Sequence, residues 1–351
     1  MAIVSLMERE DTLVSTIREM IEKMERETLS PYATLNENSK GRDFDEPQCD
    51  IRPLFQRDRD RILHSKAFRR LKNKTQVFLT PQGDHYRTRL SHTLEVSQNA
   101  RTIAKALRLN EDLVEAIALG HDLGHTPFGH AGEAQLNEMC STGFVHSEQS
   151  VRIVEKLEKG GQGLNLTWEV RDGIRNHQTE GKPATPEGAI VRLSDKIAYV
   201  NSDIDDAIRA HILCEEDIPF AIRKTLGMTT NDRLDTLIHD VIISSYDSPI
   251  ITMSPEIEGA MKELRAFMFA NVYKDSVAKV EEVKAKRMMR ELFLYYESHL
   301  DALPIRYQQM IADGEAADRV ICDYISGMTD QYAITKFNEY FMPQAWVVDG
   351  Y

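Results

Sequence analysis

Apolar residues recur at steps of three and four along most of the chain, a spacing that places them on one face of an α-helix. Three stripes are clear: within residues 1–29, in the segment that begins near residue 92, and in the segment that begins at residue 185. Their members are Leu13, Ile17, Met20 and Met24; Val96, Ala100, Ile103 and Leu107; and Leu193, Ile197, Val200, Ile204 and Ile208. The pattern predicts an all-α fold.

Helix boundaries can be predicted from capping residues. Asn110 is a good N-cap, and the helix that follows it is expected to end near Gly124, with Pro127 blocking its continuation. Thr185 followed by Pro186 is an N-cap with proline at the first helical position, so a long helix is expected to begin there.

The helical pattern also suggests how the chain is organised. Residues 30–50 are rich in Asn, Ser, Gly, Asp and Pro and are expected to form a loop. We expect an N-terminal helix and loop over 1–50, a catalytic core over 51–215, and a C-terminal helical region over 216–351. No convincing linker separates the last two, so the C-terminal helices are expected to pack on the core within one continuous domain.

Composition narrows the class of protein. With 351 residues, 42% hydrophobic and 28% charged, the chain fits a soluble, helix-rich globular protein. The net charge of −13 argues against a broad basic surface for duplex DNA, so an anionic substrate requires a local positive pocket. Four scattered cysteines disfavour a disulfide framework, and no apolar run approaches the roughly 18 residues of a membrane span. A cytoplasmic protein without a membrane partner is expected.

A basic segment runs from Arg52 to Lys74. It carries nine Lys or Arg residues and is opposed only by Asp58 and Asp60. Such a segment is commonly a solvated helix face. In so acidic a chain, a wall that faces phosphate groups is the competing interpretation.

Histidines concentrate in one part of the chain. Six of the eleven fall between residues 85 and 146, and they are His85, His92, His121, His125, His130 and His146. Structural histidines would be spread more evenly, so this clustering favours a functional site. The pair His239-Asp240 has no companion histidine or glycine turn and is interpreted as an ordinary feature of a helix surface.

A metal site is predicted around His121-Asp122. This pair ends an apolar helix just before Gly124, and His92 opens the preceding helix. With Asp195 from a later helix, two imidazoles and two carboxylates can meet at one cation. This ligand set suits Mn, Fe, Co, Ni, Zn or Mg in an open site, which leaves positions for a water and a substrate oxygen.

Two further groups of polar residues accompany the metal set. His130 and Glu133 are three residues apart, and if a helix starts near Gly129 they share a face as an acid–base pair. A polar stripe follows the helix that begins at residue 185. It is either the solvent side of that helix or a surface for a phosphorylated sugar, and it consists of Arg192, Asp195, Lys196, Tyr199, Asp203 and Asp206.

Several long motifs, in order, resemble those of one known family. They include Phe55-Gln-Arg-Asp-Arg-Asp-Arg61, Lys74-Thr-Gln-Val-Phe78, His121-Asp-Leu-Gly-His-Thr-Pro-Phe-Gly-His130 and Leu193-Ser-Asp-Lys-Ile-Ala-Tyr199. Over roughly residues 30 to 342 the chain resembles the HD-domain deoxynucleoside triphosphate (dNTP) triphosphohydrolases, the dGTPase-like family. The resemblance implies an all-α HD fold with additional C-terminal helices and hydrolysis of a dNTP to the deoxynucleoside and inorganic triphosphate.

The resemblance also implies roles for individual residues. His130 matches the catalytic histidine, with Glu133 as its partner, while His125 and His146 match histidines that contact phosphates or transfer protons. The implied metal ligands are His92, His121, Asp122 and Asp195. The implied substrate contacts are Arg89, Lys196 and Arg70 for the triphosphate, Gln76 and Val77 beside the deoxyribose, where they would exclude a 2′-hydroxyl, and Tyr199 and Asp203 at the sugar.

The resemblance further implies a homo-oligomer, and a nucleotide effector or single-stranded nucleic acid stays open as a further partner. Two alternative functions stay open. The chain could be another HD-type phosphohydrolase, such as a nucleotide monophosphatase or cyclic-nucleotide phosphodiesterase. It could instead be a dNTP-sensing or single-stranded nucleic-acid-binding regulator with a silent site.

Overall fold

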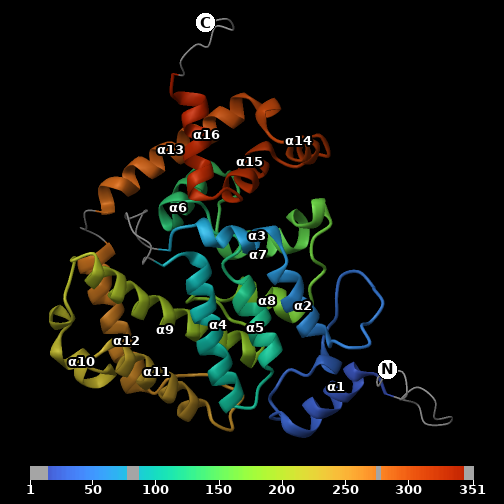
Figure 1. Cartoon of the computed structure of the whole chain (residues 1–351), viewed down its shortest axis with the longest axis vertical. Helices are drawn as coiled ribbons and strands as arrows, with labels where there is room; N and C mark the ends of the chain where they lie inside the picture. Colours follow the sequence, from blue (N-terminus) through green and yellow to red (C-terminus); the bar gives the residue numbers. More distant parts are fainter. Residues whose placement is uncertain (1–14, 77–86, 274–277, 344–351) are drawn as a thin grey trace, which may run out of the picture.

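The computed structural model describes residues 15–76, 87–273 and 278–343 (Figure 1). These residues form sixteen α-helices with short 3₁₀ and π segments and no strand, which confirms the all-α prediction. No helix among them has both the length and the apolar character needed to cross a membrane. The helices are α1 (Ile17–Thr28), α2 (Leu54–Leu63), α3 (Lys66–Arg70), α4 (Arg89–Ala106), α5 (Glu111–Gly120), α6 (Gly129–Met139), α7 (His146–Arg152), α8 (Trp168–Arg175), α9 (Pro186–Arg209), α10 (Phe220–Leu226), α11 (Thr230–Ser245), α12 (Pro255–Met268), α13 (Ala278–Ser298), α14 (Ile305–Ala312), α15 (Ala317–Ser326) and α16 (Asp330–Phe341).

Capping residues set the predicted helix starts. The Asn110 side chain accepts a hydrogen bond from the backbone N–H of Leu113, and Thr185 accepts one from Gly188, with Pro186 at the first position of α9. The end of α5 lies at Gly120, before the predicted Gly124. The next four residues instead form a tight turn that carries His121 and Asp122.

The main hydrophobic core lies between α4, α5 and α9, and α2, α8, α11 and α12 pack around these three helices (Figure 1). The stripes predicted on α4 and α9 face this core. Val96, Ala100 and Ile103 are fully buried, as are Ile197, Val200 and Ile204. Burial of these apolar faces is what brings the three helices, and the polar residues at their ends, to one place.

Helix α1 differs from the prediction in its packing. The helix is present, but Ile17, Met20 and Met24 are more than half exposed, so the apolar stripe does not enter the core; Leu13 lies outside the described residues. The helix is held by a polar contact instead, because the Glu25 carboxylate accepts a hydrogen bond from the side chain of Asn36 at 2.6 Å.

A second core joins the C-terminal helices to α6. Phe128, Leu136 and Phe144 pack there against buried residues of α13 and α15 such as Phe293 and Ile321. In Figure 1, α13 to α16 form a layer at one end of the molecule, next to α6. The helix that carries His130 and Glu133 is therefore supported by the C-terminal region.

Buried polar contacts tie the C-terminal helices to the predicted site. The Lys74 ammonium donates to the backbone carbonyls of His125 (2.5 Å) and Ser326 (2.8 Å). The Asp330 carboxylate accepts from the backbone N–H of Thr75 (2.9 Å) and of Phe128 (3.0 Å). Both contacts hold the turn between α5 and α6 against residues 326–330.

Asp323 on α15 makes a third tie, and we predict that its removal weakens the whole fold. Its buried carboxylate accepts from Arg152 at 2.6 and 2.8 Å and from the Gln149 side chain at 2.9 Å. Asp323→Ala leaves a partly buried guanidinium short of its partner, so the free energy of unfolding should fall by about 3 kcal/mol in urea denaturation.

Asp313→Ala is the matched control for this change. Asp313 is an exposed aspartate whose side chain accepts a hydrogen bond from Gln309, one turn away on α14, at 2.8 Å. We expect it to change the free energy of unfolding by less than about 0.5 kcal/mol. Equal losses in the two variants would contradict a special role for Asp323.

Candidate metal centre and active site

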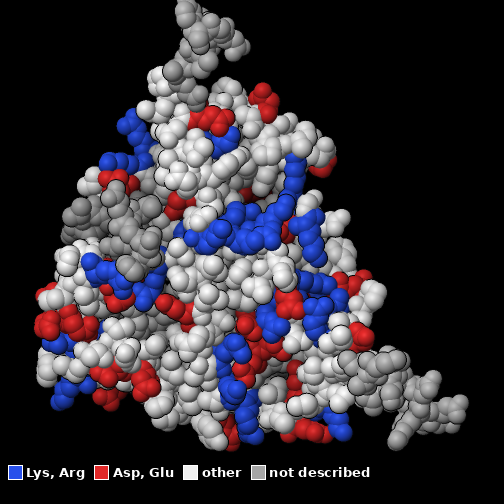
Figure 2. Space-filling model, viewed as in Figure 1, with Lys and Arg blue, Asp and Glu red and all other residues white. Residues whose placement is uncertain are grey.

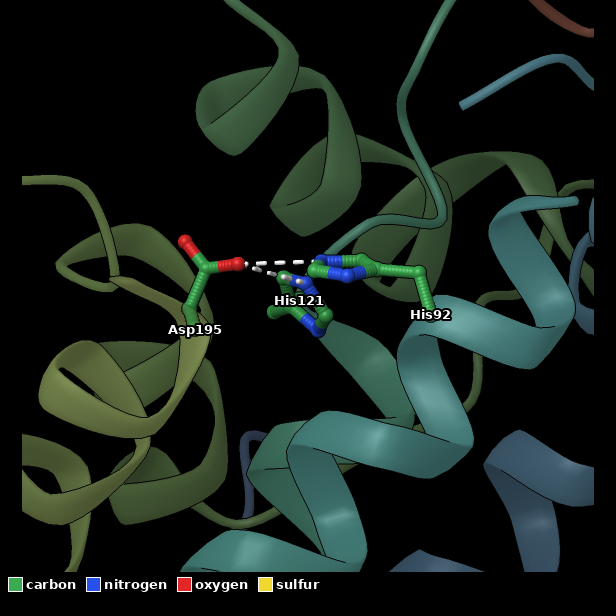
Figure 3. A group of neighbouring side chains, drawn as sticks. All are labelled: His92, His121 and Asp195. Carbon is green, nitrogen blue, oxygen red and sulfur yellow. Dashed lines mark hydrogen bonds and ion pairs between the residues drawn. The ribbon is translucent and has the colours of Figure 1, made fainter. Parts of the chain in front are cut away.

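Three helices deliver the candidate ligands to one point. His92 projects from the first turn of α4, His121 follows the last residue of α5, and Asp195 lies in the middle of α9 (Figure 3). The Asp195 Oδ1 atom lies 3.0 Å from His92 Nε2 and 3.8 Å from His121 Nε2. One nitrogen or oxygen from each of the three residues falls within 4.8 Å of the others.

The orientation of the His121 ring favours a cation. Its Nδ1 lies 2.7 Å from the backbone carbonyl of Ala118 and must donate there, which leaves the Nε2 lone pair facing Asp122 and Asp195. This Nε2 is buried and has no hydrogen-bond partner among the described residues. A buried lone pair facing two carboxylates fits a divalent ion, which would satisfy all three groups.

Asp122 lies beside this triad. Its Oδ1 is 3.5 Å from His121 Nε2 and 3.4 Å from His125 Nε2, while Oδ2 accepts from Arg89 at 2.8 Å. Burial alone would raise the pKa of this carboxyl, but the basic groups around it, His121, His125 and Arg89, outweigh burial and hold the pKa well below its ordinary value. Asp122 therefore stays a carboxylate.

Glycine makes the His121–Asp122 turn possible. A Cβ on Gly124 would lie 2.3 Å from the backbone nitrogen of Ser150 and 2.4 Å from the carbonyl oxygen of His146. The turn therefore packs directly on the backbone of α7, where the Ser150 hydroxyl donates to the carbonyl of His121 at 2.7 Å and accepts from the N–H of Gly124 at 2.8 Å. This contact sets α7, and with it His146, beside the metal residues.

Glu133 bridges two imidazoles. Its carboxylate lies 2.8 Å from His146 Nδ1 and 3.4 Å from His130 Nδ1, with His130 exposed and His146 buried. Burial would raise the pKa of Glu133, but the hydrogen bonds from His130 and His146 outweigh burial and lower that pKa below its ordinary value. The predicted pairing of His130 with Glu133 on α6 is present, and His146 is the closer partner.

His177 belongs to the site, although the sequence analysis did not include it. It is buried at the end of α8, its Nδ1 lies 2.7 Å from the carbonyl of Ile174, and its ring centroid is 5.0 Å from that of His121. Burial, followed by the neighbouring imidazoles of His121 and His146, lowers the pKa of His177 to about 4. The sequence does contain a signal for His177, because this residue continues the helical face on which Val170 and Ile174 are buried.

The hydrogen-bond partners of His146 indicate how its two ring nitrogens are used. His177 donates its Nδ1 proton to a carbonyl, so its Nε2 must accept, and the partner 3.2 Å away is His146 Nε2. The other nitrogen of His146 faces the Glu133 carboxylate and must also donate. Both nitrogens of His146 therefore lie at donor positions, one toward His177 and the other toward Glu133.

A second histidine, His125, lies against the His146 ring. The rings of His125 and His146 stack with centroids 3.8 Å apart. Burial, followed by the charges of Arg89 and His146, holds the pKa of His125 well below its ordinary value. The site thus places a proton donor beside a neutral imidazole that borders Asp122.

The predicted substrate residues of α9 extend away from Asp195. Burial, then the charges of Arg192 and Arg265, lowers the pKa of Lys196 to about 8, and burial raises the pKa of Tyr199 to about 12. Asp203 is buried one turn further along.

The remaining predicted substrate residues occupy different places. Gln76 is buried, and its backbone carbonyl accepts from Arg89 at 3.4 Å. Val77 lies outside the described residues, as does His85. Arg70 lines a separate cavity of about 660 Å³, and none of the predicted metal ligands borders that cavity.

This separate cavity is built largely by the basic segment. Figure 2 shows the Lys and Arg side chains gathered over α2 and α3. Part of the charge is neutralised, because Arg52 pairs with Asp60 and both Arg57 and Arg61 pair with Glu46. The segment is therefore neither a plain solvated face nor part of the metal centre.

Comparison with known proteins adds the family. The HD domain matches residues 89–200, which include all four predicted metal ligands, and the phosphohydrolase-associated domain matches residues 251–339. A solved structure of a hypothetical protein from Aquifex aeolicus superposes with a TM-score of 0.48 at 21% identity, over 80% of this chain and 67% of that one.

Close relatives cover nearly the whole chain. Proteins named deoxyguanosinetriphosphate triphosphohydrolase-like are 57% identical in Caldanaerobacter subterraneus subsp. tengcongensis, over 94% of this chain and 97% of the relative, and 49% identical in Desulfatibacillum aliphaticivorans, over 95% and 100%. A third, from Geobacter sulfurreducens, is 39% identical over 93% and 98%. The chain therefore belongs to the deoxyguanosinetriphosphate triphosphohydrolase-like family of HD-domain phosphohydrolases.

Proposed function

We propose that the protein hydrolyses deoxynucleoside triphosphates to the deoxynucleoside and inorganic triphosphate. The observation that carries the proposal is the buried convergence of His92, His121 and Asp195 beside the Glu133–His146 ion pair. Such an arrangement supplies a cation site and a charged proton donor side by side. The names of the relatives favour a nucleoside triphosphate over other phosphate esters.

The candidate ligands are His92, His121, Asp122 and Asp195. A divalent ion, whether Mn, Mg, Fe, Co, Ni or Zn, would supply Lewis acidity at the α-phosphate and lower the pKa of a bound water. The protein's own contribution is orientation, since Ala118 fixes the tautomer of His121 and Arg89 holds one oxygen of Asp122.

Proton transfer falls to the histidines around Glu133. A water oxygen joins the α-phosphorus and gives up one proton to solvent, the bond from phosphorus to the 5′-oxygen breaks, and the 5′-oxygen takes a proton. His146, in contact with Glu133, is assigned the role of proton donor, while the exposed His130 can return a proton from solvent through Glu133. His125, neutral and stacked on His146, faces the phosphate side with Asp122.

The sugar and the phosphates are assigned to residues around α9. Lys196 and Arg89 supply positive charge for the triphosphate, and Tyr199 and Asp203 contact the deoxyribose. Gln76 and Val77 exclude a 2′-hydroxyl, so ATP and GTP should be poor substrates; turnover of ribonucleotides equal to that of dNTPs would refute this assignment.

Two alternative activities would leave different products. Another HD phosphohydrolase would release orthophosphate or pyrophosphate. A regulator with a silent site would bind dNTP and metal and release nothing. The intact His130, Glu133 and His146 cluster favours an active enzyme over a silent site.

The reaction can be tested by chromatography of the products from each of the four dNTPs with Mn²⁺ or Mg²⁺. We expect deoxynucleoside and intact triphosphate. His121→Ala should lower kcat/KM by more than about 100-fold, because even residues that merely support a metal ligand contribute 10- to 100-fold. His239→Ala, at the exposed histidine of the second His-Asp pair, is the matched control and should stay at the wild-type rate.

Metal removal should destabilise the protein. The ion binds the folded state only, so saturation at about 100 times Kd adds about 2.7 kcal/mol to the free energy of unfolding. We expect chelation by EDTA to lower Tm by several degrees and added Mn²⁺ to restore it. Asp195→Asn should abolish the metal-dependent part of Tm, and a variant that keeps the full shift would exclude Asp195 as a ligand.

Glu133→Gln tests the proton donor. The substitution removes the charge that pairs with the His146 imidazolium while keeping the shape of the side chain, so kcat should fall about 100-fold or more and KM should change little. Steady-state kinetics with the preferred dNTP measure both. Glu138→Gln, on the exposed side of the same helix, should behave as wild type. A Glu133→Gln effect confined to KM would place this residue in substrate binding instead.

A further inference from the structure

Two buried histidines of the site have the same local environment. His121 follows the last residue of α5, and its Nδ1 lies 2.7 Å from the carbonyl of Ala118, three residues earlier. His177 lies just beyond the end of α8, and its Nδ1 lies 2.7 Å from the carbonyl of Ile174, again three residues earlier. In both rings Nδ1 donates to the backbone, so Nε2 presents a lone pair. His177 is therefore held in the same way as the candidate metal ligand His121.

His146 faces the lone pair of His177. The Nε2 atoms of the two rings lie 3.2 Å apart, while Nδ1 of His146 lies 2.8 Å from one oxygen of Glu133 and 3.0 Å from the other. A carboxylate in this place fixes a proton on Nδ1, as it does for many histidines that bind metals. The side-chain amide of Gln178, 3.3 Å away, is a further polar neighbour of Nε2. The space between the two Nε2 atoms therefore takes either a proton or a cation.

The spacing of the two nitrogens fits a bound ion. Zn²⁺ holds imidazole nitrogen at about 2.0–2.1 Å, so two such nitrogens lie about 2.9 Å apart at a right angle and about 3.3 Å apart at the tetrahedral angle. The distance of 3.2 Å between His146 and His177 falls in this range. Asp122 supplies a third ligand atom, because one atom from each of these three buried residues lies within 4.8 Å of the others.

This second group, Asp122, His146 and His177, is separate from the first. The first group consists of His92, His121 and Asp195, and the two groups have no residue in common. Asp122 borders both, since its Oδ1 lies 3.5 Å from Nε2 of His121. Two cations can therefore bind on the two sides of one carboxylate.

The charges around the second group make its ion the weaker of the two. Glu133 and Asp122 favour a cation there, but Arg89 donates to Oδ2 of Asp122 at 2.8 Å and lessens the negative charge of that carboxylate. Two divalent ions beside the same carboxylate also repel each other. We therefore expect the first group to fill at lower metal concentration and the second group to fill later.

The donor atoms of the second group select the ion. Imidazole nitrogen suits Zn²⁺, Ni²⁺ and Cu²⁺, whereas Mg²⁺ and Ca²⁺ prefer oxygen ligands. The second group offers two imidazoles and one carboxylate. An ion of the zinc type should therefore bind there, and Mg²⁺ should not.

We propose that Asp122, His146 and His177 form a second cation site, and that a zinc-type ion bound there inhibits the enzyme. The inhibition rests on the proposed function, in which His146 donates a proton to the leaving 5′-oxygen. An ion on Nε2 of His146 takes the place of the proton on that nitrogen, and Nδ1 stays bound to Glu133. Neither nitrogen is then free to deliver a proton, so the first site supports turnover and the second site, when filled, stops it.

Counting bound ions is the direct test of the site. Full-length protein is stripped with EDTA and dialysed to equilibrium against increasing free Zn²⁺, and the bound zinc is measured by atomic emission. We expect two ions per chain in the wild type. Asp195→Asn should lose the tighter ion, and His177→Asn and His177→Phe should each lose the weaker one. With Mg²⁺ in place of Zn²⁺, the second site should stay empty at every concentration.

The two His177 variants guard against misfolding. His177→Asn keeps an N–H group for the carbonyl of Ile174, and His177→Phe keeps a ring in the buried position. Thermal melts identify a variant that does not fold. His239→Asn is the matched control, because it removes an exposed histidine outside the second group and should leave two ions bound.

The inhibitory role is measured with the same proteins and a dNTP. As the second ion binds, wild-type kcat should fall about 100-fold or more, the loss expected for a general acid, and lowering free Zn²⁺ should restore it. The rate at high Zn²⁺ is divided by the rate at low Zn²⁺ within each variant, so a changed basal rate does not enter. Displacement of the active metal from the first site would inhibit the wild type and the His177 variants alike. Inhibition that requires His177 therefore identifies the second site.

The outcomes separate this site from the reaction. One zinc ion per wild-type chain, or two in a folded His177 variant, would overturn the second site. Equal inhibition in wild type and variants would overturn its inhibitory role. If a second ion binds in a manner that depends on His177 and no dNTP is hydrolysed with any metal, the proposed function fails and the cation site stands. If triphosphate is released and the wild type binds a single ion, the reaction stands and the second site is wrong.

Discussion

The burial of Asp122 as a charged carboxylate is the constraint on which the site depends. A carboxylate removed from water must be surrounded by positive charge and hydrogen-bond donors, or it takes up a proton. Arg89 donates to one oxygen of Asp122 at 2.8 Å, and the rings of His121 and His125 lie within 3.5 Å of the other oxygen. The two histidines are fixed in turn: the carbonyl of Ala118 holds the His121 ring, and the Lys74 ammonium holds the carbonyl of His125. The charge of the buried Asp122 carboxylate is thus stabilised by contacts that several helices hold in place.

The C-terminal region is part of this arrangement. Asp330 and the carbonyl of Ser326 hold the turn between α5 and α6 through Thr75, Phe128 and Lys74, and α13 packs on the helix that carries Glu133. Helix α12 lies beside α9 and faces the stripe that follows Asp195. The HD domain supplies the candidate ligands, and the associated region positions them.

The sequence predicted what depends on local pattern. The stripes and caps of α4, α5 and α9 gave the helices, and the clustered histidines pointed to the place where their ends meet. What it missed depends on tertiary contact. His177 is far along the chain from the cluster and reaches it only because α8 packs on α5 and α7. The stripe of α1 remains exposed, because periodicity cannot say which apolar face finds a partner. Arg70 lies in a different cavity from the one that its motif implied, and the approach of Arg265 to Tyr199 requires the packing of α12 on α9.

The distribution of protons across the site separates its tasks. Burial and neighbouring basic groups lower the pKa of His177 and of His125, whereas His146 between them lies in hydrogen-bond contact with the Glu133 carboxylate. A neutral imidazole can accept a proton or bind a metal ion. Only a protonated imidazole can donate a proton without becoming a buried anion. The metal end of the site therefore holds lone pairs and carboxylates, the α6–α7 end holds the removable proton, and the α9–α12 end holds fixed positive charge. A nucleoside triphosphate would fit this arrangement. Its negative phosphate chain lies on one side of the α-phosphorus, and the sugar oxygen that must take up a proton lies on the other side.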